Sequence, residues 1–477
     1  MKRLPAYSGA TVPDLHRFPA QTPTGRGSYE SAGALSWVWN GRSLVLGSCA
    51  IAAAGTGEGK TSIALAFARA ARDAGYSVAP FKCGPDYLDA QLYARACGER
   101  ARTIDLWLDG PENVAAELHA AQGRAMLIEG MMGLFDGDDE GATSSAHIFS
   151  AYDIPTILVL DGWRASQTLA AIALGCSLMQ PRVRLIGAVM NRAGGDGHQA
   201  AVRRALASVG IPLIASLPYR AAWKLPERHL GLDVSADANL ETTISEMATM
   251  LAQQCDLASL FGVPRTVPTR LPMTSGGPII AVADDEALMF TYPQTLDALR
   301  AAGAQCVAFS PLRDAALPRG TSGMWLGGGY PELHAEQLAA NAGLRHDIAD
   351  AVASGMPVYA ECGGYMYLGR SLRTVSGIFP MCAALNGETS IDEPALTIGY
   401  RQLRAADDSP LDVKGNAIRA YEFHYARGTF DDPPAYAGVE NPGSKRNNTV
   451  ASFFHRRFYQ GDTATCRFVE ACSQFSR

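Results

Sequence analysis

Short, unbroken apolar runs alternate with longer alanine-rich amphipathic stretches along most of the chain. The first run, at 43–50, is followed by a glycine-rich turn and a predicted helix over 62–74. Similar apolar runs recur at 77–81, 125–129, 155–160 and 184–190. Runs without alternating polarity are typical of parallel strands that are buried on both faces. The pattern therefore predicts an α/β fold, with helices covering both faces of a parallel sheet.

The pattern is interrupted between residues 256 and 277, where proline and glycine accumulate. A second series of apolar runs then begins, at 278–283, 305–309, 323–326 and 357–360. We therefore predict two α/β domains, over 43–255 and 278–477, joined by a linker over 256–277. Residues 1–42, rich in Pro, Gly, Ser and Thr, are predicted to be a disordered extension or sequence upstream of the true start.

Composition and charge limit the kinds of binding partner and compartment that we expect for this chain. The 477 residues carry a net charge of -6 and no blocks of basic residues, which argues against nucleic acid. The ten cysteines form no Cys-x-x-Cys pair, so reduced thiols in the cytoplasm fit better than a disulfide lattice or metal cage. No apolar run approaches the roughly 20 residues that span a bilayer, so no membrane partner is expected.

A glycine-rich loop, Ala-Gly-Thr-Gly-Glu-Gly-Lys-Thr, ends at Thr61 between the first predicted strand and helix. Gly57 and Gly59 would let backbone N–H groups surround phosphate oxygens of ATP. Lys60 would neutralise phosphate charge and Thr61 would offer its hydroxyl to Mg²⁺. The strict G-x-x-x-x-G-K-[ST] pattern has glycine where Ala54 stands, so a simple glycine-rich turn is the alternative.

Acidic residues follow the next predicted strands. Asp86 and Asp89 come after the second strand, and Glu129 and Asp136 after the third. Strand ends of an open parallel sheet meet in one crevice, so these carboxylates could converge on phosphate and Mg²⁺. Each one alone would be better explained as a solvated loop carboxylate, but the recurrence at successive strand ends favours a function. Asn191, at another strand end, could contact adenine or simply form a turn.

The second domain contains a candidate nucleophile, Cys362, where an apolar run breaks into two glycines. A thiol on such an elbow, at the start of a helix, benefits from the positive helix end. Backbone N–H groups at Gly328 and Gly329 could form an oxyanion hole. His455 is the preferred partner base and His424 its competitor, because sequence distance cannot show which one meets the thiol.

Together these segments resemble a known family. The chain is similar to cobyrinic acid or hydrogenobyrinic acid a,c-diamide synthases, glutamine-dependent amidotransferases of corrin biosynthesis. Their first half resembles dethiobiotin synthetase and their second half class I glutaminases. The resemblance spans roughly 43–475, and its markers lie at 59–61, 81–89, 129–136, 228–232, 309–312, 327–332, 361–364 and 422–425.

The resemblance implies a division of labour. Cys362 and His455 would release ammonia from glutamine, while the first domain would use ATP to activate a carboxylate of the corrinoid as an acyl phosphate. Asp86 and Glu129 would assist Thr61 in holding Mg²⁺. The remaining implied contacts are to the acyl-transfer site (Tyr87, Asp89, Asp136) and to the corrinoid (Arg228, His229).

Some positions depart from the family pattern. Ala53, Tyr421 and Arg457 stand where glycine, histidine and histidine are usual. These departures concern fine substrate contacts and leave Cys362 and His455 intact. Alternatives are a relative that amidates another tetrapyrrole, such as nickel-sirohydrochlorin, or a P-loop ATPase fused to an inactive glutaminase-like module. A homodimer is compatible with the sequence.

Overall fold

The computed structural model describes residues 47–86, 88–137, 143–179, 181–223, 238–264 and 276–475. The predicted extension over 1–42 and three expected substrate residues, Tyr87, Arg228 and His229, lie outside these ranges. The described residues from Gly47 onward form one compact unit.

The first half is built on a sheet of seven parallel strands in the order β3-β2-β4-β1-β5-β6-β7. Its central strand is buried at every position, as expected for an unbroken apolar run. The strands are β1 (Ser48–Ala53), β2 (Val78–Cys83), β3 (Arg102–Ile104), β4 (Ala125–Glu129), β5 (Thr156–Asp161), β6 (Leu185–Ala193) and β7 (Leu213–Pro218).

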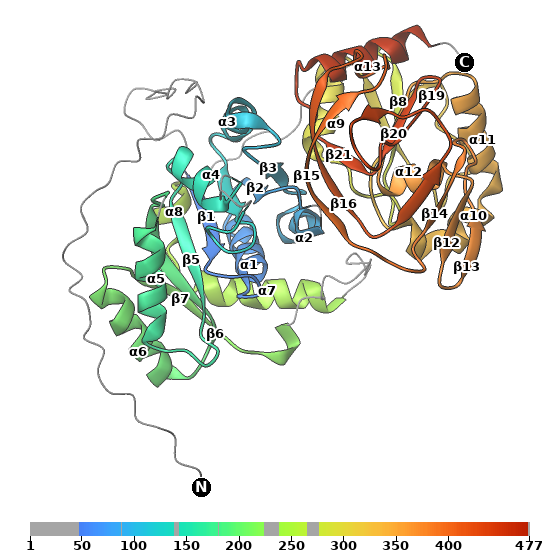
Figure 1. Ribbon diagram of the computed structural model, residues 1–477. Coiled ribbons are helices and arrows are strands. Elements are labelled where there is room, and N and C mark those ends of the chain that lie inside the picture. The colour runs from blue at the N-terminus through green and yellow to red at the C-terminus, as the bar shows by residue number, and fades with distance from the viewer. Residues whose placement is uncertain are drawn as a thin grey trace, which may run out of the picture. The chain divides into compact units, whose positions relative to one another are not determined.

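Helices cover both faces of this sheet (Figure 1). One core layer includes side chains from α1 (Lys60–Asp73), α2 (Leu88–Cys97), α7 (Ala238–Ala252) and α8 (Leu257–Phe261). The other includes side chains from α3 (Gly110–Ala120), α4 (Ser145–Ala151), α5 (Thr168–Leu178) and α6 (Asp196–Ser208). A short 3₁₀ turn, η1 (Ala221–Trp223), follows β7. The predicted parallel α/β domain is confirmed. The predicted linker over 256–277 contains α8, and its residues 265–275 lie outside the described ranges.

The second half contains a six-stranded sheet in the order β19-β20-β11-β10-β8-β9. All neighbouring strands are parallel except β19 and β20. The strands are β8 (Ile279–Ala283), β9 (Gln305–Phe309), β10 (Thr321–Leu326), β11 (Val358–Glu361), β19 (Ser444–Arg446) and β20 (Thr449–Ser452).

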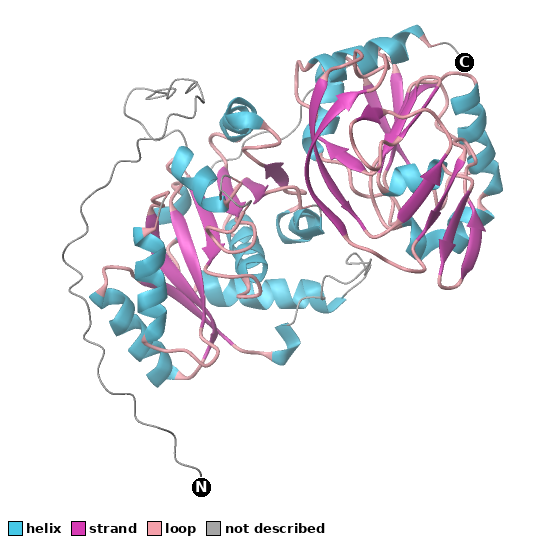
Figure 2. Ribbon diagram, viewed as in Figure 1, coloured by secondary structure: helices cyan, strands magenta, loops and turns pink. Residues whose placement is uncertain are grey.

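Two further four-stranded sheets accompany it (Figure 2). The first, β13-β12-β14-β17, comprises β12 (Ser371–Thr374), β13 (Gly377–Pro380), β14 (Gly387–Ser390) and β17 (Arg427–Phe430). The second, β18-β15-β16-β21, is antiparallel and comprises β15 (Thr397–Ala405), β16 (Ala417–His424), β18 (Tyr436–Ala437) and β21 (Phe454–Arg456). Neither of these sheets was predicted from the sequence.

The six-stranded sheet also has a core layer on each face. One layer includes residues of α10 (Ala335–Ala340), α11 (Ala342–Ala353) and α12 (Gly363–Leu368). The other includes residues of α9 (Pro293–Ala301), α13 (Thr463–Gln474) and the β18-β15-β16-β21 sheet. A 3₁₀ turn, η2 (Pro331–His334), precedes α10. Within the described ranges, every helix is too short or too polar to cross a lipid bilayer.

Candidate active sites

The phosphate loop connects the end of β1 to the first residue of α1, Lys60. Gly57 and Gly59 have φ angles of 85° and 95°, which favour glycine. A Cβ on Gly59 would lie 2.1 Å from Asn191 Nδ2, and this amide donates to the Glu58 carbonyl at 2.9 Å. Asn191 therefore braces the loop, and its expected contact with adenine stays a prediction. The N-terminus of α1 is positioned to receive an anion.

A cluster of oppositely charged side chains adjoins this loop. The Thr61 hydroxyl donates to Glu129 Oε1 at 2.7 Å and to Asp89 Oδ2 at 3.3 Å. Lys82 Nζ lies 3.3 Å from Glu129 Oε1 and 3.4 Å from Asp89 Oδ2, and it donates to the Gly130 carbonyl at 2.9 Å. β2 pairs with β4 so that Lys82 lies opposite Glu129. The predicted convergence of carboxylates at these strand ends is thus present for Asp89 and Glu129.

Lys82 and Tyr93 belong to this cluster although we did not predict them. Lys82 is 2% exposed, and Tyr93 is fully buried and donates to Glu129 Oε2 at 2.8 Å. Burial, together with the charge of Glu129, raises the pKa of the Tyr93 phenol well above its usual value, so it remains a donor. A lysine inside an otherwise apolar strand was the available signal, because a buried ammonium requires paired carboxylates.

The other two predicted carboxylates lie at loop ends nearby. Asp86 Oδ1 accepts a hydrogen bond from the Asp89 N–H at 3.3 Å, at the start of α2. Asp136 Oδ2 accepts from the Gly133 N–H at 2.9 Å. A Cβ on Gly133 would lie 2.7 Å from the Ala54 carbonyl, which places the Asp136 turn against the beginning of the phosphate loop.

The thiol lies on the sharp turn that was predicted. Cys362 joins β11 to α12 with φ 48° and ψ -107°, an unusual conformation for a residue with a Cβ. The next residues must be small: a Cβ on Gly363 would lie 2.8 Å from Gly329 N, and one on Gly364 would lie 2.5 Å from the Leu326 carbonyl. The Gly-Gly pair therefore lets the elbow pack against the glycine segment that follows β10.

His455, on β21, reaches the thiol. A Cβ on Gly328 would lie 2.9 Å from His455 Cε1 and 3.5 Å from Cys362 Cβ, so both side chains border the same glycine. His455 Nδ1 lies 3.5 Å from Glu361 Oε1, and Glu361 also accepts from the Tyr359 hydroxyl at 3.0 Å. Glu361 is a buried orienting group that we did not assign from the sequence.

The charge state of His455 follows from these neighbours. Burial lowers the pKa of His455, but hydrogen bonds and charges from Cys362 and Glu361 outweigh it and raise the pKa to about 10. The imidazolium therefore stabilises the fold fully below pH 6.5, and this contribution is lost as pH rises through about 10. Near neutral pH the ring is poised to donate a proton.

The competing histidine is already engaged elsewhere. His424 contacts the Ala426 carbonyl at 2.7 Å through Nδ1 and Glu422 Oε1 at 3.1 Å through Nε2. Its ring stacks on Phe453 with centroids 4.1 Å apart. These contacts use both ring nitrogens, which favours His455 as the partner of the thiol.

The two glycines predicted to donate N–H groups to the oxyanion, Gly328 and Gly329, differ in their contacts. Gly328 N–H donates to the Phe290 carbonyl at 3.1 Å, and Phe290 N–H returns a bond to the Gly328 carbonyl at 2.9 Å. The expectation for Gly328 is therefore corrected, because its N–H already has an acceptor. Gly329 lies against Gly363, whose N–H begins α12 and lacks an intrahelical acceptor.

Comparison with known proteins assigns the two halves. Residues 49–232 match the CobQ/CobB/MinD/ParA nucleotide binding domain, and residues 279–463 match the CobB/CobQ-like glutamine amidotransferase domain. The hydrogenobyrinate a,c-diamide synthase of Brucella abortus is 39% identical over 79% of this chain and 88% of its own length. Those of Streptomyces coelicolor and Thermobifida fusca are 35% and 34% identical, over 88% and 90% of this chain and 96% and 97% of theirs. The chain belongs to the hydrogenobyrinate a,c-diamide synthase family. Members of this family are glutamine-dependent amidotransferase ligases of cobalamin biosynthesis.

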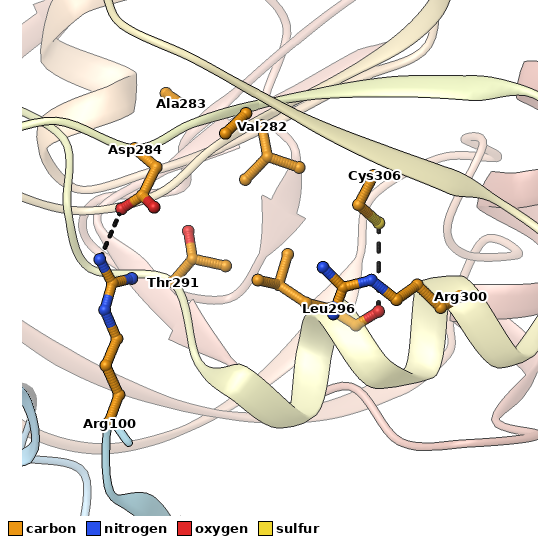
Figure 3. Close-up of a pocket in the computed structure, with 9 residues that line it drawn as sticks. Arg100, Val282, Ala283, Asp284, Thr291, Leu296, Arg300 and Cys306 are labelled. Atoms are coloured by element: carbon orange, nitrogen blue, oxygen red, sulfur yellow. Dashed lines mark hydrogen bonds and ion pairs between the residues drawn. The ribbon is translucent and has the colours of Figure 1, made fainter. Parts of the chain in front are cut away.

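The synthase family assignment agrees with the positions of both sites. The nucleotide-binding domain includes the loop and the Glu129 cluster, and the amidotransferase domain includes Cys362 and His455. A cavity of about 110 Å³, lined by residues of the second half and by Arg100, contains none of these residues (Figure 3). At this cavity, Arg100 Nη2 of the first half lies 2.8 Å from Asp284 Oδ1 of the second half.

Replacing His455 by asparagine is expected to lower the rate of glutamine hydrolysis by about 10²-fold or more, since a positioned acid–base group contributes on that scale. The rate of glutamate release measures this effect. His424→Asn is the matched control and should change the rate far less. A larger loss in the His424 variant would reverse the assignment.

Proposed function

We propose that this chain amidates the a and c carboxylates of hydrogenobyrinic or cobyrinic acid in turn, with glutamine as nitrogen donor and ATP as activating substrate. The observation that carries the proposal is the presence of two separate groups of functional side chains in one unit. One is the Cys362–His455 pair, with Glu361 behind the imidazole. The other is the phosphate loop with Thr61 and Glu129 at its base. The names of the relatives support the choice of substrate.

In the proposed glutaminase reaction, the Cys362 thiolate attacks the carboxamide carbon of glutamine. The developing oxyanion would be stabilised by the N–H groups of Gly329 and Gly363, in place of Gly328. His455 donates a proton to the departing nitrogen, ammonia leaves, and a thioester remains. Water then hydrolyses the thioester, releasing glutamate and returning the thiolate.

In the proposed synthetase reaction, an oxygen of the corrinoid carboxylate attacks the γ-phosphorus of ATP, and ADP leaves. The resulting acyl phosphate has a good leaving group, which a free carboxylate lacks. Ammonia attacks the acyl carbon, and phosphate departs as the amide forms. Lys60 and the N-terminus of α1 would hold the phosphates of ATP. Because ammonia is mostly ammonium at neutral pH, sheltered transfer within one protein keeps it nucleophilic.

The residues at this site fit Mg²⁺. The Thr61 hydroxyl is a hard oxygen ligand and lies within hydrogen-bonding distance of two others, the carboxylates of Glu129 and Asp89. Mg²⁺ needs only one or two such protein ligands when phosphate oxygens and water complete its shell. When bound, it would neutralise phosphate charge. Asp86, which we predicted as a ligand, would act through α2 by its contact with the Asp89 N–H.

The acyl-transfer and corrinoid contacts remain proposals from resemblance. Asp136 lies beside the phosphate loop, which suits a role near the activated carboxylate. Asp89 combines this role with its contact to Thr61. Tyr87, Arg228 and His229 lie outside the described residues, and we propose that they complete the corrinoid site.

A cytoplasmic location and small-molecule partners fit the same proposal. All ten cysteines are free, as expected in a reducing compartment. We expect neither nucleic acid nor membrane as partner, and a homodimer is compatible with the proposal. The alternative of a P-loop ATPase with an inactive module is disfavoured by the intact Cys362–His455 pair.

The substrate is tested by mass. The protein is incubated with ATP, Mg²⁺ and glutamine and, in separate reactions, with hydrogenobyrinic acid, cobyrinic acid or nickel-sirohydrochlorin. We expect two successive conversions of carboxylate to carboxamide on hydrogenobyrinic or cobyrinic acid. Conversion of nickel-sirohydrochlorin alone would favour the alternative tetrapyrrole, and no conversion of any substrate would refute an amidotransferase.

A further inference from the structure

Arg457 directly follows β21, the strand that carries His455, and its side chain enters the nucleotide-binding half. Nε lies 3.2 Å from Asp109 Oδ1, and Nη1 donates to the Thr103 hydroxyl on β3. Nη2 donates to the Gly84 carbonyl at 3.4 Å. The side chain is only 4% exposed. A buried guanidinium thus joins the segment that holds the glutaminase base to the end of strand β2.

The Gly84–Pro85 turn is closely connected to the nucleotide site. It follows β2, which carries Lys82, and precedes α2, which carries Asp89. Both of these side chains contact Glu129 or Thr61 in the cluster below the phosphate loop. A rearrangement of that cluster when phosphates and a cation bind would therefore act on both ends of the turn.

A second side chain reaches the same turn from the residues just before α9, which pair with the glycine segment beside Cys362. The Tyr292 hydroxyl donates to the Pro85 carbonyl at 3.3 Å, and the Arg457 guanidinium lies 3.8 Å from the Tyr292 ring centroid. Phe290, just before Tyr292, exchanges two backbone hydrogen bonds with Gly328. Arg457 and Tyr292 thus connect one turn to both sides of the glutaminase site.

The Tyr459 hydroxyl donates to the same Asp109 oxygen as Arg457, but two other contacts between the halves end elsewhere. Arg102 pairs with Asp297 at 2.6 Å, and Arg419 Nη1 donates to the Trp107 carbonyl at 2.8 Å. Arg419 also lies over the Trp107 ring, 5.5 Å from its centroid. These contacts can hold the halves together, but they adjoin neither His455 nor the Gly84–Pro85 turn. Arg419 therefore serves as a matched control for an interface arginine.

We propose that Arg457, together with Tyr292, is a positioning residue that couples the two active sites. When the nucleotide and acceptor site is occupied, this coupling changes the geometry of His455 and Gly328, and thereby the rate of glutamine hydrolysis. The inference rests on the proposed function and adds its regulation. The physical basis of this coupling is a buried guanidinium that can form two hydrogen bonds at once. A change in the Gly84–Pro85 turn must either move the guanidinium or break its hydrogen bond to the turn. Coupling between two sites of this kind commonly changes affinities by about fivefold or more, and we expect an effect of similar size on the rate.

The test uses the full-length enzyme and compares glutamate release with and without ATP, Mg²⁺ and hydrogenobyrinic acid. We expect wild type to be stimulated. Tyr292→Phe removes only the hydroxyl, and Arg457→Lys keeps a charge opposite Asp109 but loses the planar fork. Both variants should lower the ratio of stimulated to basal rate by about fivefold. Arg419→Gln should keep the wild-type ratio.

Amidation driven by added ammonium separates coupling from folding, because it bypasses Cys362. We expect Tyr292→Phe and Arg457→Lys to retain it. Failure of wild type to amidate with either nitrogen source would refute the proposed function. A wild type that amidates but shows no stimulation, or variants that keep the full ratio, would overturn the coupling alone. An equal loss in Arg419→Gln would also overturn it, since any interface contact would then suffice.

Discussion

Cys362→Ala is expected to lower glutamine-dependent amidation by about 10³-fold or more while leaving ammonium-dependent amidation close to wild type. The thiol is the only group on the elbow between β11 and α12 that can form the thioester. Removing it leaves the phosphate loop untouched, because the two sites share no residue. Parallel assays with glutamine and with ammonium salts, each followed by product mass, measure both rates in one preparation.

Cys466→Ala supplies the matched control, since Cys466 is an exposed cysteine on α13 of the same domain. It should keep both activities. Undiminished glutamine-dependent turnover in Cys362→Ala would exclude this thiol as the nucleophile. Loss of the ammonium route as well would show that the two half-reactions cannot be separated by this substitution.

The parallel sheet of the first half was predictable from five of its seven strands, β1, β2, β4, β5 and β6, because each of these is an apolar run, whereas β3 and β7 were not predicted. The elbow at Cys362 was predictable for a related reason: two glycines directly after a buried run require a sharp turn. The antiparallel strands were not. β15 reads Thr-Ile-Gly-Tyr-Arg-Gln-Leu-Arg-Ala, and its apolar and polar residues do not alternate cleanly. Which face of this strand is buried depends on the strands that it pairs with, and its own sequence does not reveal them.

Side-chain partnerships across the chain were also beyond the sequence. Glu361 was visible beside Cys362 in the sequence. Its contact with His455, however, depends on two strand pairings that the sequence does not show, that of β11 with β20 and that of β16 with β21. Arg457 was noted only as a departure from a family pattern. Its contacts with Asp109 and Gly84 depend on how the two halves meet, which no local pattern encodes.

Lys60→Ala is expected to abolish amidation from both glutamine and ammonium, by about 10³-fold or more, because charge stabilisation at the transferred phosphoryl group contributes on this scale. Lys60 is the first residue of α1 and is 8% exposed, so it lies at the helix end that we propose to receive the phosphates. Basal glutamine hydrolysis should persist, since Cys362 and His455 lie in the other half. Lys60→Ala should thus lose ammonium-dependent amidation, which Cys362→Ala should retain.

Product mass with each nitrogen source and glutamate release without ATP together measure this prediction. Lys414→Ala, at an exposed lysine in the second half, is the control and should retain all three activities. Retained ammonium-dependent synthesis in Lys60→Ala would mean that the phosphate loop does not activate the carboxylate. In that case the assignment of carboxylate activation to this loop would fail even if the thiol assignment held, because the acid would be amidated without the Lys60 ammonium.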